Sequence, residues 1–224
     1  MKKLIILGDS ILKGVTLSEE SERYKICIQR YEELAQNGVE VKNFSKMGAT
    51  IDYGERVLKE ELTDSRNDCI VLLEYGGNDC DYQWKEISEN PVSSHKCRTA
   101  PSVFKSKYKA CVEYALSKGA KVLISTLPPL DSERFTNWVS RGLNYGVIID
   151  WLGDKSVIYR WHENYSHFVE KLAEAEGVSL VDIRGAFLKA KDTGRLISKD
   201  GIHPSEDGHS LINKTITKAV LASI

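Results

Sequence analysis

An aliphatic run that ends abruptly in a glycine, an acid and a serine constrains this chain most; it spans residues 3–10. The run carries no charge after Lys3, which predicts a strand buried on both faces of a sheet, and Gly8 marks the turn that ends it. Asp9 and Ser10 then lie at the carboxyl end of the strand, the edge where open α/β sheets bind ligands. Ser10 is therefore a candidate nucleophile, with helix capping by Asp9 or Ser10 as the alternative.

The rest of the chain alternates strand patterns with helix patterns. Strands are predicted at residues 3–7, 39–44, 69–75, 120–126 and 178–182, and helices at residues 23–37, 51–64, 101–118, 161–175 and 205–224. This alternation predicts a doubly wound α/β fold, in which helices cover both faces of a five-stranded parallel sheet. The third strand is the most uniformly apolar and is placed centrally, whereas the second alternates apolar and polar side chains as an edge strand does.

Length and charge limit the classes of function. The chain has 224 residues and no shift in composition divides it, so one domain over residues 1–224 is expected. Lys and Arg number 31 against 32 Asp and Glu, which argues against a nucleic-acid or membrane partner. No apolar run reaches membrane-spanning length, and the apolar run near the start is too short for a signal peptide. The sequence does not indicate an oligomeric state.

Neither the cysteines nor the one histidine pair of the chain forms a metal-binding pattern. Five cysteines are present, none in a Cys-x-x-Cys pair, which favours reduced thiols in a cytoplasmic protein; they are Cys27, Cys69, Cys80, Cys97 and Cys111. His162 and His167 resemble the His-Glu-x-x-His zinc motif but lie one residue too far apart. On a helix, side chains five residues apart diverge by about 140°, so the two cannot share a metal ion. We therefore expect no metal and no other cofactor.

A serine hydroxyl needs a base, and the segment before the last predicted helix supplies one. Histidine is the side chain whose ordinary pKa suits this task, and His203 is the candidate. A carboxylate on the other ring nitrogen keeps such a histidine correctly aimed, and Asp200 lies three residues earlier, within one turn of backbone. The spacing therefore predicts an acid–base pair that acts on Ser10.

Acyl transfer develops negative charge on the carbonyl oxygen of the substrate, which fixed hydrogen-bond donors stabilise. The candidate donors are the main-chain N–H groups of Ser10 and Gly48 and the side-chain amide of Asn78, because all three follow predicted strands and open at the same sheet edge. Asp9 and Asp79 are interpreted as structural, since short acids in turns hold their loops by accepting main-chain N–H groups.

These residues occur in the order found in a known family. The chain resembles the SGNH hydrolases, which include the GDSL-type esterases: residues 8–11 match the nucleophile block, Gly48 the second block, residues 76–79 the Gly-x-Asn-Asp block and residues 200–204 the Asp-x-x-His block. The resemblance implies a flavodoxin-like three-layer α/β/α fold. It also implies a Ser10–His203–Asp200 triad and an oxyanion hole formed by Ser10, Gly48 and Asn78. Ile11 stands where the naming motif has leucine, a change of similar volume.

Two long connections, residues 80–100 and 130–144, are expected to overhang the site. They carry flat and polar side chains that suit a sugar or another polar alcohol, namely Asp81, Tyr82, Trp84 and Trp138. Packing of Trp84 and Trp138 onto the body of the protein is the alternative. The hypothesis is a serine esterase acting on small acyl esters, such as an acetyl group on a carbohydrate, because no long apolar segment is available for a fatty chain.

Other activities fit the same residues. The same triad could transfer the acyl group to an alcohol other than water. A non-catalytic flavodoxin-like module could instead hold a phosphate or a flavin with residues 8–14, although this loop fits neither Gly-x-Gly-x-x-Gly nor Gly-x-x-x-x-Gly-Lys. Among the other histidines, His95 could contact substrate from its long loop, and His209 is expected to be a surface or capping group.

Overall fold

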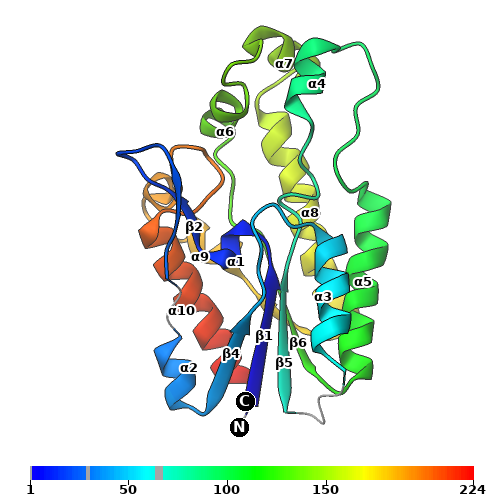
Figure 1. Ribbon diagram of the computed structural model, residues 1–224, viewed down its shortest axis with the longest axis vertical. Coiled ribbons are helices and arrows are strands. Elements are labelled where there is room, and N and C mark those ends of the chain that lie inside the picture. Colours follow the sequence, from blue (N-terminus) through cyan, green and yellow to red (C-terminus); the bar gives the residue numbers. More distant parts are fainter. Residues whose placement is uncertain (1, 29–30, 64–67) are drawn as a thin grey trace.

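The computed structural model describes residues 2–28, 31–63 and 68–224, and a five-stranded parallel sheet in the order β4-β1-β5-β6-β7 lies at its centre (Figure 1). The strands are β1 (Lys2–Gly8), β4 (Val39–Asn43), β5 (Cys69–Glu74), β6 (Lys121–Ser125) and β7 (Ser179–Val181). Counted along the chain, this is the 2-1-3-4-5 order of flavodoxin-like proteins. The predicted fold class is confirmed.

The place of each strand in the sheet follows from its apolar content. β5 is buried along its whole length and pairs with β1 on one side and β6 on the other, so it is central as predicted. β4 lies at the edge of the sheet and leaves Glu40 and Lys42 exposed. In the register of β1 with β5, Gly8 is opposite Glu74, so the two strands end side by side.

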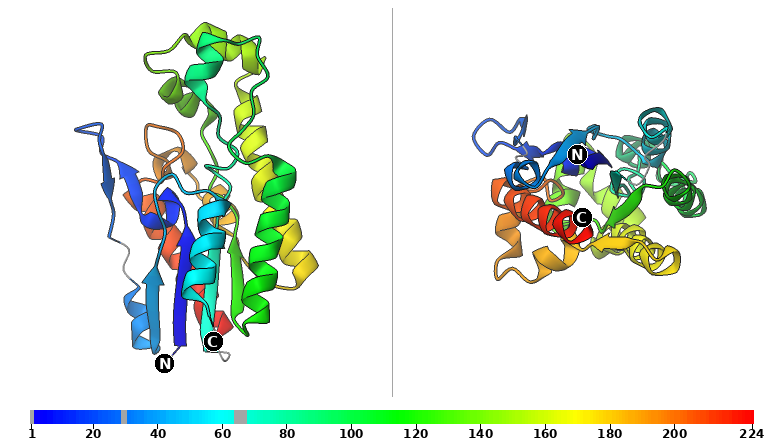
Figure 2. Two further views of the ribbon diagram at one scale, coloured as in Figure 1. Left: turned by 45° about the vertical axis from the view of Figure 1, so that its right-hand side comes forward. Right: turned by 90° about the horizontal axis from the view of Figure 1, so that it is seen from below.

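Helices cover both faces of this sheet, as Figure 2 shows from below. The helices are α1 (Ser10–Lys13), α2 (Glu32–Gln36), α3 (Ile51–Glu61), α4 (Trp84–Glu89), α5 (Pro101–Ser117), α6 (Ser132–Val139), α7 (Tyr145–Leu152), α8 (Ser156–Glu176), α9 (Ile183–Leu188) and α10 (Glu206–Ser223), with a 3₁₀ turn at Thr193–Leu196. One face packs against α3, α5 and α8, and the other against α1, α2, α9 and α10. Side chains alternate along β1 and β5, so each strand feeds both cores.

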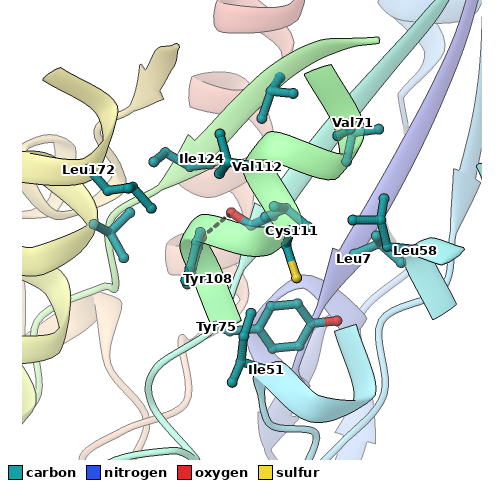
Figure 3. Packing of buried hydrophobic residues seen from close by; sticks show 14 of the residues in the cluster. Leu7, Ile51, Leu58, Val71, Tyr75, Tyr108, Cys111, Val112, Ile124 and Leu172 are labelled. Atoms are coloured by element: carbon teal, nitrogen blue, oxygen red, sulfur yellow. Dashed lines mark hydrogen bonds between the residues drawn. The ribbon is translucent and has the colours of Figure 1, made fainter. Parts of the chain in front are cut away.

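The core on the α3, α5 and α8 side is tightly fitted around two tyrosines (Figure 3). Tyr75 and Tyr108 are both fully buried. The Tyr108 hydroxyl donates to the main-chain oxygen of Leu73 over 3.0 Å. The Tyr75 ring lies directly against Gly54 of α3, where an added Cβ would come within 2.4 Å of the ring. Glycine at this position therefore allows α3 to approach the sheet.

A third apolar cluster sits above the carboxyl edge of the sheet. It is formed by α4, α6, α7 and the start of α8, which stand together at the top of Figure 1. Both long connections predicted from the sequence contribute to it: residues 80–100 contain α4, and residues 130–144 contain α6. These connections are therefore partly helical and packed against each other, with Phe135 and Ile158 buried between them.

The helix predicted over residues 23–37 is wrong. Tyr24–Ile26 forms the strand β3, which pairs antiparallel with β2 (Val15–Leu17), and only α2 is helical. The apolar residues at helical spacing do not share one buried face, because the Ile28 side chain is exposed whereas Leu34 is buried in the core. Residues 29 and 30 lie outside the described residues. The other predicted helices are found with ends displaced by a few residues.

No helix in the described part of the chain is long and apolar enough to cross a membrane. The extent of the domain, residues 1–224, stays a prediction.

Gly54→Ala tests the close approach of α3 to Tyr75. The added methyl would overlap the buried ring, so we expect the free energy of unfolding to fall by about 1–3 kcal/mol. Gly146→Ala is the matched control, because Gly146 also lies in a helix but its Cβ would have no neighbour closer than 3.5 Å. The control should be neutral or stabilising by up to about 1 kcal/mol. Urea unfolding measures both changes, and equal values would contradict this packing.

Candidate active site

Ser10 lies at the carboxyl end of β1, as the first residue of α1. Asp9 caps α1, because its Oδ1 accepts the main-chain N–H of Ile11 over 2.8 Å. Capping therefore falls to Asp9, and the Ser10 hydroxyl is directed to a different partner. Its Oγ lies 3.0 Å from Nε2 of His203.

The turn before α10 places Asp200 and His203 together. Oδ1 of Asp200 accepts the main-chain N–H groups of Ile202 and His203, at 3.2 and 3.1 Å. Oδ2 lies 2.7 Å from Nδ1 of His203. Nδ1 is therefore the protonated ring nitrogen, which leaves Nε2 to accept the Ser10 hydroxyl proton. The structure thus brings the three predicted triad residues into one hydrogen-bonded series.

Gly201 allows this turn to pack under α6. Its φ of +79° is in the left-handed region, and an added Cβ would meet the main-chain N of Phe135 at 2.3 Å. The Gly201 carbonyl accepts the N–H of Asp131 over 2.8 Å. The start of α6 is in this way fixed to the same turn that holds His203.

Asp200 is fully buried yet remains ionised. Burial alone raises the pKa of a carboxyl group. Here the hydrogen bond from the His203 side chain, its charge and the two main-chain N–H groups outweigh burial and lower the pKa of Asp200 below its ordinary value. A carboxylate held in this way orients the imidazole and stabilises its protonated form.

The predicted oxyanion donors line the same cavity as Ser10. Gly48 has a φ of +76°, a conformation that favours glycine. Asn78 donates one side-chain N–H to Oδ2 of Asp9 over 2.9 Å. Asp79 holds the neighbouring loop, since both its oxygens accept the N–H of Ile51 at the start of α3, and burial raises its pKa to about 6.

The cavity beside Ser10 has a volume of about 300 Å³. Its mouth is bounded by two aromatic side chains, Tyr24 from the β2–β3 hairpin and Trp138 from α6, with ring centroids 6.2 Å apart. Arg141 lies 3.7 Å above the Trp138 ring and pairs with Glu22 of the hairpin over 3.1 Å. The ion pair ties the hairpin to the end of α6 across the mouth.

Only two of the four residues predicted to contact substrate line this cavity. Asp81 and Trp138 do, but Tyr82 and Trp84 lie behind it in the third apolar cluster. Trp84 is buried and donates its ring N–H to Asp81, so packing is the correct interpretation of this residue. His95 bonds to the Asn90 carbonyl and does not line the cavity.

Among the cavity-lining residues that the sequence prediction missed are Tyr24, Glu74 and His162. Tyr24 packs edge-on against the His203 ring, with centroids 4.9 Å apart. Glu74 is a charged residue type at the end of an apolar strand, and that contrast was a signal available in the sequence. His162 lines the cavity, and its Nδ1 has no hydrogen-bond partner among the residues that the structure describes. Burial, with Arg184 nearby, lowers the pKa of His162 to about 3, so the ring is neutral.

The remaining histidine expectations have clear outcomes. His209 is buried and its Nε2 bonds to the Val15 carbonyl over 2.9 Å, so the expected surface position was wrong. The cause is that α10 packs against β2 at this point. Among the described residues, no group of three or more His, Cys, Asp or Glu side chains could hold a metal ion.

Comparison with known proteins gives one family. The model of the GDSL-like lipase/acylhydrolase family matches residues 6–211 of the chain. No curated protein sequence matches the chain significantly.

Solved structures share the fold over nearly the whole chain. The lipase/acylhydrolase from Enterococcus faecalis superposes with a TM-score of 0.68 at 18% identity, covering 100% of this chain and 97% of its own. TesA gives 0.62 at 21% identity, with 100% of both chains covered. A catalytic mutant of Axe2, an acetylxylan esterase from Geobacillus stearothermophilus, gives 0.66 at 16% identity and coverage of 98% and 94%. At these identities the likeness concerns the fold.

Replacement of Tyr24 tests its contact with His203. Tyr24→Ala removes the ring that packs against the imidazole, and because such a contact is worth about 0.5–1.5 kcal/mol, kcat for an ester substrate should fall roughly 3- to 10-fold. Tyr24→Phe keeps the ring and is the matched control, with kcat close to wild type. Steady-state kinetics on both variants measure the difference. An equal loss in the two variants would assign the effect to the hydroxyl and contradict a role for the ring.

Proposed function

The chain belongs to the GDSL-like lipase/acylhydrolase family and is therefore a hydrolase of carboxylic esters; within that class, we propose a serine esterase that acts on small acyl esters through an acyl-enzyme on Ser10. The observation that carries the proposal is the hydrogen-bonded series from Asp200 through His203 to Ser10, with distances of 2.7 and 3.0 Å. A nucleophile, a base and an orienting carboxylate in this order are what acyl transfer by serine requires.

The proposed reaction has two halves. Ser10 Oγ attacks the ester carbonyl carbon while His203 Nε2 takes the hydroxyl proton and then gives it to the departing alcohol. A water molecule next attacks the acyl-enzyme while His203 takes its proton, and the Ser10–acyl bond breaks to release the acid as His203 returns that proton to Ser10 Oγ. In both halves the main-chain N–H groups of Ser10 and Gly48 and the amide of Asn78 stabilise the oxyanion.

The shape of the cavity supports a small substrate. A volume of about 300 Å³ is at the lower end of ligand pockets, and it must accommodate both the acyl group and part of the alcohol. Tyr24 and Trp138 offer aromatic faces at the mouth, and Asp81 and Arg98 offer polar groups beside Asn78. These features, with the acetylxylan esterase among the similar folds, support an acetyl ester of a carbohydrate as the substrate.

The alternative functions, a non-catalytic binding module and acyl transfer to an alcohol, are supported to different degrees. Membership in a hydrolase family favours an enzyme over a non-catalytic flavodoxin-like module. Acyl transfer to another alcohol uses the same first half-reaction, so product analysis with added alcohols distinguishes it from hydrolysis. A cytoplasmic location stays a prediction from the cysteine pattern, and oligomeric state is not part of the proposal.

Hydrolysis of p-nitrophenyl esters from acetyl to octanoyl tests the nucleophile and the acyl size together. Ser10→Ala should abolish acyl-enzyme formation and lower kcat by a factor on the order of 10⁴ or more. Ser102→Ala is the matched control, because Ser102 is an exposed serine on α5. The wild type should prefer acetyl over octanoyl esters. Equal rates in wild type and Ser10→Ala would overturn the proposed triad, whereas a strong octanoyl preference would overturn only the substrate.

The pH dependence of kcat/KM tests the base. The lowered pKa of Asp200 keeps its carboxylate ionised. A histidine base must be neutral to accept the Ser10 proton, and histidine is the side chain whose ordinary pKa lies near neutrality. We therefore expect kcat/KM to fall towards pH 5. Asp79→Asn is the control, because burial raises the pKa of the Asp79 carboxyl to about 6, and the fall should persist when this carboxyl is removed. A flat profile from pH 5 to 8 would contradict a histidine base.

A further inference from the structure

Glu74 is a buried acid beside the site for which the proposed reaction has no role. It is the last residue of β5, is fully buried and contributes to the wall of the cavity. Within the described residues, neither of its carboxyl oxygens has a partner at the distance and angle of a normal hydrogen bond, and the donor that acts on them is the main-chain N–H of Asp9. Apart from burial, the group that acts on it most strongly is the carboxyl of Asp9, which is 1% exposed.

The register of the sheet brings the two acids together. Gly8 of β1 pairs with Glu74 of β5, and Asp9 follows Gly8 directly. A Cβ on Gly8 would lie 3.2 Å from Oε2 of Glu74 and 3.0 Å from Cβ of Leu12. The missing side chain of Gly8 therefore leaves the space that the Glu74 carboxyl occupies beneath α1.

Two ionised carboxylates in contact and away from water would repel strongly, so the pair retains a proton. The negative charge belongs on Asp9, which accepts N–H groups from Ile11 and Asn78 at 2.8 and 2.9 Å. Burial raises the pKa of both acids, and burial together with the charge of Asp9 raises that of Glu74 well above its ordinary value. The proton of the pair is therefore assigned to Glu74, the acid without the two N–H donors.

Among the described residues, the titratable groups that act most strongly on this pair include no lysine or arginine. Asp79, from the loop after β5, is an acid, and Tyr75 and Tyr108 are neutral phenols whose pKa values burial raises further. His203, from the turn before α10, acts on Asp9 and favours the ionised form of that carboxyl when it is protonated. These groups leave the proton on Glu74 and the charge on Asp9.

We propose that Glu74 is a positioning residue for the oxyanion hole: as a neutral acid it donates a hydrogen bond to Asp9 and holds Asp9 where it accepts the side-chain amide of Asn78. The inference rests on the proposed function, in which Asn78 stabilises the oxyanion.

The orientation of the Asn78 amide explains why this matters. A side-chain amide has a donor end and an acceptor end, and rotation by half a turn exchanges them. An Asp9 carboxylate held in place accepts only from the NH₂ end, which leaves the second N–H of that end for the substrate oxygen. If Asp9 moved, the carbonyl end of Asn78 could face the oxyanion and repel it. The proton on Glu74 thus acts on catalysis through two other side chains.

Infrared difference spectra test the protonation state without using activity. Wild type and Glu74→Gln are compared at neutral pH. The wild type should show one additional C=O band of an un-ionised carboxylic acid, which the amide variant lacks. Asp79 contributes equally to both spectra and cancels. A carboxylate band in its place would show that Glu74 is ionised and would overturn the proposal, whatever the outcome for Ser10→Ala.

Kinetics test the route through Asn78. Glu74→Leu removes the donor at similar volume and should lower kcat roughly 10-fold or more with little change in KM, whereas Glu74→Gln retains a neutral donor and should restore most of kcat. Asn78→Ala alone should lower kcat by about 10²–10³. In the Asn78→Ala background, Glu74→Leu should have less than about a twofold further effect, because the group it positions is absent.

Three results would overturn this role. One is a Glu74→Leu variant with wild-type kcat, and another is a Glu74→Gln variant that loses as much as Glu74→Leu. The third is the same fold-loss from Glu74→Leu with and without Asn78, which indicates general damage to β5. Should Glu74→Leu fail to fold, as judged by circular dichroism, the infrared comparison and the same cycle with Glu74→Met decide the question.

Discussion

The parallel pairing of β1 with β5 is the interaction on which the site depends. Because Gly8 is opposite Glu74, the two central strands end at the same level, and the chain leaves both of them at one edge of the sheet. The nucleophile loop and the loop that carries Asn78 therefore start from a rigid base with apolar cores on both faces. A slip of one residue in this pairing would separate Asp9 from Asn78 and turn Glu74 to the opposite face of the sheet.

The loops above this edge use one physical device repeatedly. In each, a buried aspartate accepts a main-chain N–H group of the segment that follows it or packs beside it: Asp9 from Ile11, Asp79 from Ile51, and Asp200 from His203. Each acid fixes its loop through a buried hydrogen bond. Each also helps to orient the loop or side chain of a proposed site residue. The resulting negative charge is balanced by main-chain N–H dipoles and by His203.

The sheet and the short motifs at its carboxyl edge could be predicted from the sequence. Features that depend on contacts between distant segments could not. Asp200 and His203 could be paired because three residues of backbone bring them together, and the central place of β5 followed from its unbroken apolar run. The β2–β3 hairpin was missed because its strands have three residues each, and its apolar positions happen to fit a helical period. Trp84 and Trp138 had the same sequence signature, and only the packing of α4 against α6 separates core from cavity.

The mouth of the cavity is built from connections alone. Tyr24 and Glu22 belong to the hairpin after β1, and Trp138 and Arg141 belong to the segment after β6. None of these four residues lies on a strand of the parallel sheet. Insertions or deletions in either connection can therefore remodel the entrance without disturbing the sheet or the turn at Asp200. Chains of this fold can therefore diverge in the connections around the cavity mouth while the catalytic residues stay the same. Two such chains can catalyse the same reaction on different substrates.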